Sequence, residues 1–260
     1  MSVPENPTAR VDESPVAASL VSLVVPTYNE RENIVVLLDQ VLATMGGFPL
    51  EVCVVDDDSP DGTWQAVAAY AGRHPEVGVI RRLGERGLSG AVIAGFRRAR
   101  GDLLAVMDAD LSHDPALLPV LAKAVFAGAD VAVGSRRIPG GGADVWPWYR
   151  RLASNSATAL ARWTLGVGLA DPMSGYFVMR RRLFEAVADR LQPGGYKILL
   201  EIVAQAGPLT LVELPYVFRD RRQGVSKVTP RVVGQYLRSV ARLRRARGQS
   251  SGWEVPPRQR

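Results

Sequence analysis

Two carboxylates stand one residue apart in the motif Asp108-Ala109-Asp110, directly after the apolar run Leu103–Met107. An apolar run of this length predicts a buried strand, which places both carboxylates at a strand end. Mg²⁺ and Mn²⁺ prefer carboxylate oxygens and commonly share their coordination with substrate phosphates. The pair therefore indicates a divalent metal site. The alternative is an acidic loop that only caps the helix expected from Pro115.

A second acidic group follows another predicted strand, Glu51–Val55. It reads Asp56-Asp57-Asp58-Ser59-Pro60-Asp61-Gly62-Thr63. Asp61 and Gly62 predict a turn, and Asp61 or Thr63 can cap the next helix. Three successive carboxylates repel one another, so a turn alone is a poor reason for them. Because carboxylates accept hydrogen bonds from base and ribose donors, Asp57 is the candidate for binding a nucleotide.

Neither common glycine-rich phosphate-binding motif occurs in the sequence. The closest stretch, Gly87-Leu88-Ser89-Gly90, has the wrong spacing, which disfavours kinases and dinucleotide-dependent dehydrogenases. A metal ion together with basic side chains can hold a diphosphate instead. Four basic residues in expected loops or at element ends are the candidates: Arg136, Arg150, Arg221 and Lys227. Most of the remaining arginines are expected to be solvated surface charges.

The elements that position these residues alternate along the chain. Apolar runs predict strands, and apolar residues three and four apart predict helices. The expected strands are Leu20–Val25, Glu51–Val55, Val77–Arg81, Leu103–Met107, Val131–Gly134, Gly175–Met179 and Leu209–Phe218. The expected helices are Glu30–Met45, Thr63–Gly72, Ser89–Arg100, Pro115–Phe126, Trp148–Leu165, Arg181–Leu191, Ile198–Ala206 and Thr229–Arg247. The expected loops are a mobile glycine-rich one, Arg136–Trp148, and a basic one, Arg219–Ser226.

Short strands separated by helices predict an α/β fold with a mostly parallel sheet and helices on both faces. Ligands bind such sheets beyond the carboxyl ends of the strands. The acidic groups and the segment Tyr28–Glu30 all follow expected strands, so we expect them to share one edge of the sheet. The expected organisation is a flexible segment 1–19, one domain 20–228, a basic amphipathic helix 229–247 and a disordered tail 248–260.

The composition is that of an ordinary globular protein, with 47% hydrophobic and 22% charged residues among 260. The single cysteine, Cys53, excludes an internal disulfide framework, and two histidines exclude a His-rich metal site. The longest run without Asp, Glu, Lys or Arg has 16 residues, shorter than the roughly 20 of a membrane-spanning helix. Residues 1–19 lack a basic start and an apolar block, so we expect no secretory signal and a cytoplasmic protein.

The charge is divided unevenly along the chain. Residues 1–218 carry 20 basic and 24 acidic side chains, a net charge of −4, whereas residues 219–260 carry 12 and 2, a net charge of +10. A basic tail fits nucleic acid, an anionic membrane surface or plain solvation, and an acidic body disfavours nucleic acid. The expected C-terminal helix has an apolar stripe beside its arginines: Tyr236, Leu237, Val240 and Leu243. We expect it to lie on a membrane, the alternative being a helix packed on the domain with its arginines in solvent.

The motifs described above belong to a longer ordered series that covers about residues 20–237. Its members are Pro26-Thr27-Tyr28-Asn29-Glu30, Asp56–Thr63, Asp108–Pro115, Gly134-Ser135-Arg136, Trp146-Pro147-Trp148-Tyr149-Arg150, Asp171-Pro172-Met173-Ser174-Gly175-Tyr176, Gly195–Glu201 and Gly224-Val225-Ser226-Lys227. In their joint order and spacing the sequence resembles family-2 glycosyltransferases with the GT-A fold. Within that family it is most similar to the polyprenyl- or dolichyl-phosphate mannose synthases.

The resemblance implies an inverting reaction in which GDP-mannose and a polyprenyl phosphate give polyprenyl-phosphate mannose and GDP. It implies a donor pocket at Pro26, Tyr28, Glu30, Val55 and Asp57. It implies a diphosphate and Mg²⁺ or Mn²⁺ region at Asp108, Ala109, Asp110 and Ser112, with Asp108 and Asp110 as the metal ligands. The family often carries Gln in place of Ser112, so ligation by Ser112 is not expected. Phosphate contacts are implied for Arg136, Arg150, Arg221 and Lys227, with Asp110, Arg136 and Arg221 as the catalytic residues.

The residue chemistry agrees with that reaction. A polyprenyl phosphate is already anionic and attacks without a strong general base, and the sequence offers no evident Ser–His or His–carboxylate pair. The reaction instead needs its phosphate charges neutralised, by a metal on the leaving diphosphate and by guanidinium groups around the acceptor. Some relatives carry transmembrane helices after the catalytic domain. We therefore expect either that the basic C-terminal helix places the enzyme at the inner membrane face or that a separate membrane-spanning partner presents the lipid.

Other functions remain open at this point. The same chemistry with another sugar nucleotide, such as UDP-glucose, fits the same residues. A non-catalytic subunit that scaffolds a membrane complex is a different class, and it has no need of both the Asp108/Asp110 pair and the basic loops. A nucleic-acid-binding protein is suggested only by the tail, and we expect no nucleic-acid partner.

Overall fold

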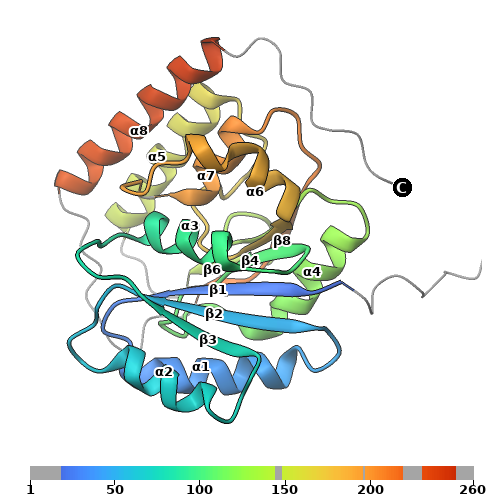
Figure 1. Cartoon of the computed structure of the whole chain (residues 1–260). Helices are drawn as coiled ribbons and strands as arrows, with labels where there is room; N and C mark the ends of the chain where they lie inside the picture. The colour runs from blue at the N-terminus through green and yellow to red at the C-terminus, as the bar shows by residue number, and fades with distance from the viewer. Residues whose placement is uncertain (1–18, 144–147, 196, 219–229, 250–260) are drawn as a thin grey trace, which may run out of the picture.

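The structure, a computed structural model, describes residues 19–143, 148–195, 197–218 and 230–249. Within them, helices cover both faces of a seven-stranded sheet of order β3-β2-β1-β4-β7-β5-β8 (Figure 1). Its strands are β1 (Val21–Thr27), β2 (Leu50–Asp56), β3 (Val77–Arg81), β4 (Leu103–Val106), β5 (Val131–Ser135), β7 (Phe177–Arg180) and β8 (Leu211–Pro215). The helices are α1 (Arg31–Thr44), α2 (Thr63–Ala71), α3 (Leu88–Arg98), α4 (Leu118–Phe126), α5 (Trp148–Leu165), α6 (Arg181–Val187), α7 (Ile198–Gln205) and α8 (Pro230–Gln249), with short 3-10 helices at Pro115–Leu117 and Ala188–Arg190.

The predicted α/β architecture is confirmed, and one strand breaks the parallel pattern. β1 pairs in parallel with β2 on one side and β4 on the other, while β7 runs antiparallel to both β4 and β5. The register places Thr27 beside Asp56 at the ends of β1 and β2. The carboxyl ends of β1, β2 and β4 therefore meet at one edge, as expected for residues that are to share a site.

Two apolar layers hold the helices on the sheet. In α1 the buried side chains Ile34, Leu37, Leu38 and Val41 recur every three to four residues, and they pack with α2 and α4 against one face. The other face is covered by α3, α5, α6, α7 and α8. Gly95 allows α3 to approach β1, because a Cβ at this position would lie 2.5 Å from a Val24 methyl carbon. The two layers make the sheet a rigid support for the loops at its edge.

The chain leaves the sheet earlier than predicted near residue 215. The expected strand Leu209–Phe218 is divided into β8, which ends at Pro215, and a short strand β9 (Val217–Phe218). β9 pairs with β6 (Gly142–Ala143), which lies in a segment expected to be a loop. Proline cannot donate a ladder hydrogen bond, and this favours an exit from the sheet at this point. The expected helix Arg181–Leu191 likewise ends early, with 3-10 geometry over its last turn.

The C-terminal helix α8 packs on the domain with its apolar side, contrary to the expected role of that stripe. Tyr236, Val240 and Leu243 are buried against the layer that contains α5 and α7, and only Leu237 of the stripe is exposed. The Tyr236 hydroxyl donates to the main-chain oxygen of Ala157 in α5. Three of these four side chains are thus taken up by the domain, so the predicted insertion of the whole stripe into a membrane is wrong. Among the described helices none combines the length and apolarity needed to cross a bilayer.

The predicted flexible segment 1–19 and tail 248–260 fall almost entirely outside the described residues, apart from the entry to β1 and the last residues of α8. The same applies to the basic loop Arg219–Ser226 and to part of the glycine-rich loop. Helix α8 continues to Gln249, two residues beyond its predicted end. The domain boundaries stay predictions.

Candidate active site

The acidic turn after β2 separates its three neighbouring carboxylates by giving each a different partner. Asp56 is fully buried and accepts hydrogen bonds from the hydroxyl of Thr27 (2.8 Å) and from the amide and hydroxyl of Ser59 (2.8 and 2.6 Å). Asp58 pairs at 2.6 Å with the guanidinium of Arg81. These two carboxylates therefore shape the loop.

Asp57 has polar neighbours at this turn. Its Oδ2 accepts a 2.7 Å hydrogen bond from the amide of Gly87, and its Oδ1 lies 3.4 Å from Nε of Arg82. Oδ1 is buried and has no hydrogen bond from the described residues. Burial raises the pKa of Asp57, and the Gly87 amide and Arg82 only partly oppose that rise. A buried acceptor of this kind favours binding of a ligand N–H group.

The segment after β1 lies against the acidic turn. The amide of Asn29, which has a positive φ of 61°, donates to Ser59 Oγ (2.9 Å), and the amide of Glu30 donates to Thr63 Oγ1 (3.0 Å). Glu30 precedes α1, where its carboxylate accepts from Asn33 Nδ2 (2.8 Å). The loops of β1 and β2 are thus joined into one wall.

Tyr28 is the exposed member of this wall. Its ring is 42% exposed, and the Arg86 guanidinium lies 4.5 Å from its centre. A half-exposed aromatic ring is a suitable surface for stacking a nucleotide base. Pro26 and Val55, in register on β1 and β2, are buried, with the Val55 side chain in the core against α3. Neither residue is exposed, so their predicted place in the donor pocket stays a prediction.

The segment Asp108–His113 follows β4 and is called the metal-candidate loop. Asp110 is buried, and its Oδ1 accepts from both the amide and the hydroxyl of Ser112. Ser112 is itself fully buried, and its bonds orient Asp110, in keeping with the expectation that Ser112 is not a metal ligand. Asp108 is only partly buried, and its amide donates to Nδ1 of His113 (3.1 Å). The loop thus fixes both carboxylates at the end of the strand.

The donor set of this loop fits a hard divalent cation. Asp108 and Asp110 supply carboxylate oxygens, the ligand type that Mg²⁺ and Mn²⁺ prefer, and such ions commonly complete their coordination with water and substrate phosphates. The described residues contain no group of three or more His, Cys, Asp or Glu side chains arranged to hold a metal. Two protein carboxylates plus a nucleotide diphosphate is therefore the arrangement these residues can support.

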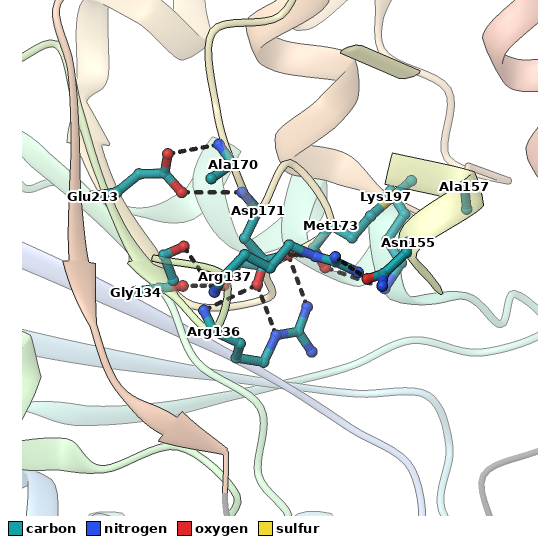
Figure 2. Close-up of polar contacts among 12 residues, drawn as sticks. Gly134, Arg136, Arg137, Asn155, Ala157, Ala170, Asp171, Met173, Lys197 and Glu213 are labelled. Carbon is teal, nitrogen blue, oxygen red and sulfur yellow. Dashed lines mark hydrogen bonds and ion pairs between the residues drawn. The ribbon is translucent and has the colours of Figure 1, made fainter. Parts of the chain in front are cut away.

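Arg136, at the end of β5, is bound to a buried carboxylate from a distant loop. Its Nε and terminal nitrogen donate to the two oxygens of Asp171, at 2.7 and 2.9 Å, and its amide donates to the same carboxylate at 3.2 Å (Figure 2). Burial disfavours both charges, yet the pairing outweighs it: the pKa of Arg136 is raised and that of Asp171 is lowered. The Arg136 guanidinium lies 5.6 Å from the centre of the Phe218 ring, and this ring lies 5.9 Å from that of His113, beside Asp108.

Three residues around the Arg136–Asp171 ion pair were not among the predicted site residues: Asp171, Glu213 and Arg137. Glu213 of β8 accepts from the amides of Ala170 and Asp171 (2.6 and 3.0 Å) and so fixes the loop that carries Asp171 (Figure 2). Arg137 lies 3.8 Å from the Asp171 carboxylate and donates to Asn155 of α5. The order of the motifs identified the stretch beginning at Asp171, but nothing in their spacing pairs Asp171 with Arg136 or Glu213.

A model of the family described as Glycosyl transferase family 2 matches residues 22–188, the part of the chain that contains every site residue placed above except Glu213. The chain belongs to glycosyl transferase family 2. The structure adds that the family match spans β1 through α6, so it covers the whole edge of the sheet at which the acidic turn, the metal-candidate loop and Arg136 meet.

Three relatives within glycosyl transferase family 2 are similar over most of this chain. The chain is 43% identical to the dolichol-phosphate mannosyltransferase of Pyrococcus furiosus over 88% of its length and spans 65% of that protein. It is 38% identical to the polyprenol monophosphomannose synthase of Mycolicibacterium smegmatis (87% of this chain, 89% of the relative). It is also 38% identical to the dolichol-phosphate mannosyltransferase of Saccharomyces cerevisiae (85% and 86%).

Solved structures establish that this glycosyltransferase has the GT-A fold. Mannosyl-3-phosphoglycerate synthase from Rubrobacter xylanophilus aligns with a TM-score of 0.61 at 22% identity, over 93% of this chain and 79% of its own. Glucosyl-3-phosphoglycerate synthase from Mycobacterium tuberculosis, in complex with Mn²⁺, uridine diphosphate and glucosyl-3-phosphoglycerate, aligns with a TM-score of 0.62 at 20% identity, over 88% and 80%. At these identities the likeness is one of fold.

Three of the predicted phosphate contacts of this glycosyltransferase are not placed by the structure. Arg221 and Lys227 lie outside the described residues. Arg150 lies in the first turn of α5, but its side chain is not among those described. The structure thus places Asp108 and Asp110 on one loop with Arg136 close to it, and the roles of all these residues stay predictions.

Proposed function

We propose that this chain transfers mannose from GDP-mannose to a polyprenyl phosphate, releasing GDP and inverting the configuration at the sugar carbon. The observation that carries this proposal is the agreement among relatives from three lineages. Proteins 35–43% identical to this chain are named dolichol- or polyprenol-phosphate mannosyltransferases in an archaeon, bacteria and fungi. The names share two features, mannose as the sugar and a polyprenyl phosphate as the acceptor.

The Asp57 carboxylate oxygen that lacks a hydrogen bond among the described residues supports a guanine nucleotide as the donor. Guanine presents two neighbouring N–H donors, N1–H and the N2 amino group, whereas uracil presents one. A carboxylate can accept both donors of guanine, and the buried Oδ1 of Asp57 is an acceptor with no hydrogen bond from the described residues. Tyr28, exposed on the same wall, would stack on the base.

The metal-candidate loop supports a diphosphate leaving group. Asp108 and Asp110 would hold Mg²⁺ or Mn²⁺, which when bound neutralises charge on the departing GDP. Ser112 keeps the Asp110 carboxylate in one orientation through two hydrogen bonds to its Oδ1. Because the acceptor phosphate is already anionic, it attacks the sugar carbon without a side chain to remove a proton. The site accordingly needs positive charge more than a base.

Arg136 is the described guanidinium best placed to meet a phosphate. It lies within electrostatic reach of Asp108, and its ion pair with Asp171 holds it in a fixed orientation. Guanidinium groups bind phosphate oxygens through planar, directional hydrogen bonds, so a fixed orientation favours one phosphate position. Arg150, Arg221 and Lys227 complete the proposed phosphate contacts.

The acceptor's prenyl chain requires a membrane nearby. With most of the apolar stripe of α8 buried, the proposed contact is electrostatic and uses the exposed arginines Arg238, Arg244 and Arg245. Each basic residue near an anionic surface contributes about 1 kcal/mol. On the neighbouring helix α5, Trp163 is 80% exposed, and tryptophan favours the interfacial zone of a bilayer. A separate membrane-spanning partner that presents the lipid is the other arrangement.

A transfer assay that compares two sugar-nucleotide donors in parallel tests this proposal. The chain is incubated with Mn²⁺, polyprenyl phosphate in detergent and either labelled GDP-mannose or labelled UDP-glucose, and label is counted after extraction into the lipid phase. The proposal predicts lipid-linked label from GDP-mannose that EDTA abolishes. Label only from UDP-glucose contradicts the donor, and no lipid-linked label from either donor contradicts the reaction.

A further inference from the structure

His113 occupies a closed position beside the metal-candidate loop. Its side chain is 2% exposed, and its ring stacks on Tyr176 with centres 4.9 Å apart. The rings of Tyr216 and Phe218 meet it edge-on, at 5.6 and 5.9 Å. The Tyr176 hydroxyl in turn donates to the main-chain oxygen of Asp114. Packing of this kind holds the imidazole in one orientation.

The imidazole completes the hydrogen bonding of β4 where its ladder ends. The pairing of β4 with β1 and β7 stops at Val106, so the amide of Asp108 lies beyond the sheet. This amide donates to Nδ1 of His113 at 3.1 Å. A nitrogen that accepts a hydrogen bond carries no proton, so the neutral ring must carry its proton on Nε2. Nε2 lies 3.8 Å from Oδ2 of the same Asp108.

Both ring nitrogens therefore face one residue, on its backbone and its carboxylate. Gly175 also lies against this carboxylate: a Cβ at that position would be 3.0 Å from Oδ2. Within the loop, His113 contacts Asp108 and Ser112 donates to Asp110. The two carboxylates of the pair thus have separate supports.

We propose that His113 is the positioning residue of the site, and that its Nδ1 acceptor fixes the start of the loop so that Asp108 points toward the divalent cation. The proposal rests on the proposed function for the role of Asp108 as a metal ligand. His113 touches neither donor nor acceptor in this account and acts only through Asp108. Removing a group that orients a metal ligand typically weakens metal binding 10- to 100-fold.

Substitutions at His113 separate this role from simple packing. His113→Asn keeps an acceptor near the position of Nδ1, and His113→Leu has nearly the same size and shape as Asn without the acceptor. His113→Phe keeps the stacked ring and also lacks the acceptor. If His113 positions Asp108, the Asn variant loses the least metal affinity of the three. If His113 only packs against its neighbours, the Phe variant loses the least metal affinity.

The measurement is Mn²⁺ affinity in the presence of GDP, followed by the Mn²⁺ electron paramagnetic resonance signal, with thermal unfolding as the check on folding. We expect about 10-fold or greater loss of Mn²⁺ affinity in the Leu and Phe variants and a loss below about threefold in Asn. Wild-type affinity in the Phe variant overturns the proposal. A wild-type protein that binds no Mn²⁺ with GDP overturns the metal site itself, which is a different failure.

A second readout needs no metal, nucleotide or activity. The chain has two histidines, so the ¹⁵N resonances of His113 are assigned by comparing wild type with His74→Gln. We expect His113 to be a neutral ring protonated on Nε2 in the ligand-free protein. A ring protonated on Nδ1 cannot accept from the Asp108 amide, and that result overturns the proposal even if one of the substitutions fails to fold.

Discussion

Arg136 and Asp171 are joined by two side-chain hydrogen bonds of 2.7 and 2.9 Å, although 35 residues separate them in the chain. Asp171 is completely buried and Arg136 nearly so, so neither charge is compensated by bulk water. Glu213 fixes the backbone that carries Asp171. The orientation of the guanidinium at the site therefore depends on a chain of contacts from β8 through the loop at Asp171.

Replacing Asp171 by Asn is expected to leave the guanidinium charge without its partner. Loss of one partner of a buried ion pair costs about 3–5 kcal/mol, and we expect the lower end because Asn retains one acceptor oxygen. The free energy of unfolding, measured in urea at pH 7, is expected to fall by about 3 kcal/mol. Transfer activity is expected to fall as well, because Arg136 loses its orientation.

Asp130→Asn is the matched control for that prediction. Asp130 precedes β5 and pairs with Arg182 at 2.9 Å. The substitution therefore removes a more exposed ion pair at the opposite end of the same strand from Arg136. We expect reduced stability with normal transfer from this variant. Equal losses of transfer in both variants would mean that stability alone explains the effect of Asp171→Asn.

The Asp171 pair also predicts a dependence of stability on pH. Arg136 holds the pKa of Asp171 below its unfolded value of about 3.9, despite burial that acts in the other direction. A lowered pKa stabilises the fold above the unfolded pKa, and this contribution disappears as the pH falls below it. The stability difference between wild type and Asp171→Asn should therefore be constant from pH 7 to about pH 5 and shrink toward pH 3. A difference that grows on acidification would contradict the assigned charges.

Asp110→Asn is expected to remove most transfer while leaving the fold intact. The amide keeps an oxygen for Ser112 but supplies no negative charge to a divalent cation. We expect a loss of at least about 100-fold in kcat, together with weaker Mn²⁺ binding in the presence of GDP. Asp102→Asn, just before the other end of β4, is the control and should behave as wild type. Full activity of Asp110→Asn in EDTA would exclude the metal site.

Asp57→Asn is expected to change the choice of base. Loss of a buried hydrogen bond to a charged group costs about 1.5–3 kcal/mol, so GDP should bind about 10- to 100-fold more weakly. Xanthosine diphosphate has a carbonyl oxygen where guanine has its amino group. Its binding affinity relative to that of GDP should therefore rise when an amide replaces the carboxylate. Asp58→Asn, whose partner is Arg81, is the neighbouring control. Isothermal calorimetry that gives the same GDP affinity for Asp57→Asn and wild type would remove Asp57 from the base pocket.

The raised pKa of Asp57 predicts that GDP binding through this carboxylate depends on pH. Burial raises this pKa, so the carboxylate takes up a proton at a higher pH than an ordinary aspartate at about 3.9. Protonation removes the acceptor for a base N–H. GDP affinity in wild type should therefore decline on acidification at a pH above 4, and Asp57→Asn should lack this decline.

The exposed arginines of α8 are expected to control binding to anionic vesicles. Changing Arg238, Arg244 and Arg245 to Gln removes about 3 kcal/mol of attraction at low salt. Co-sedimentation with vesicles of phosphatidylglycerol and phosphatidylcholine should fall strongly. A triple Gln variant at exposed arginines away from α8 is the control for net charge: Arg73, Arg97 and Arg98. Equal retention of both variants by the vesicles would show that α8 is not the membrane contact.

Much of the fold follows from local patterns in the sequence. The strands and helices up to residue 135 were predicted to within a few residues, because each is short, apolar and bounded by turn residues. The division of the expected strand Leu209–Phe218 was not, since β9 is defined by pairing with Gly142–Ala143, more than 70 residues away in the chain. The antiparallel direction of β7 is likewise set by tertiary packing and not by its own residues.

The site was predictable where its residues follow strands and not where they meet across loops. The positions of Asp57, Asp108 and Asp110 after strands were predicted because acidic residues directly follow apolar runs. Local patterns did not identify two partners: Asp171 for Arg136, and the Asp108 amide for His113. The stripe on α8 was misassigned because an apolar helix face looks the same in sequence whether it meets a membrane or the protein's own core.

The central claim is the formation of a mannosyl–phosphate bond on a lipid, and mass spectrometry of the lipid product tests it most directly. The chain is incubated with GDP-mannose, Mn²⁺ and a polyprenyl phosphate of defined length, and the extracted lipid and the released nucleotide are quantified together. The account predicts a lipid heavier by one hexose, formed in equal amount with GDP and absent with Asp110→Asn. Release of GDP without any change in the mass of the lipid would contradict it, because the chain would then hydrolyse the donor instead of transferring the sugar.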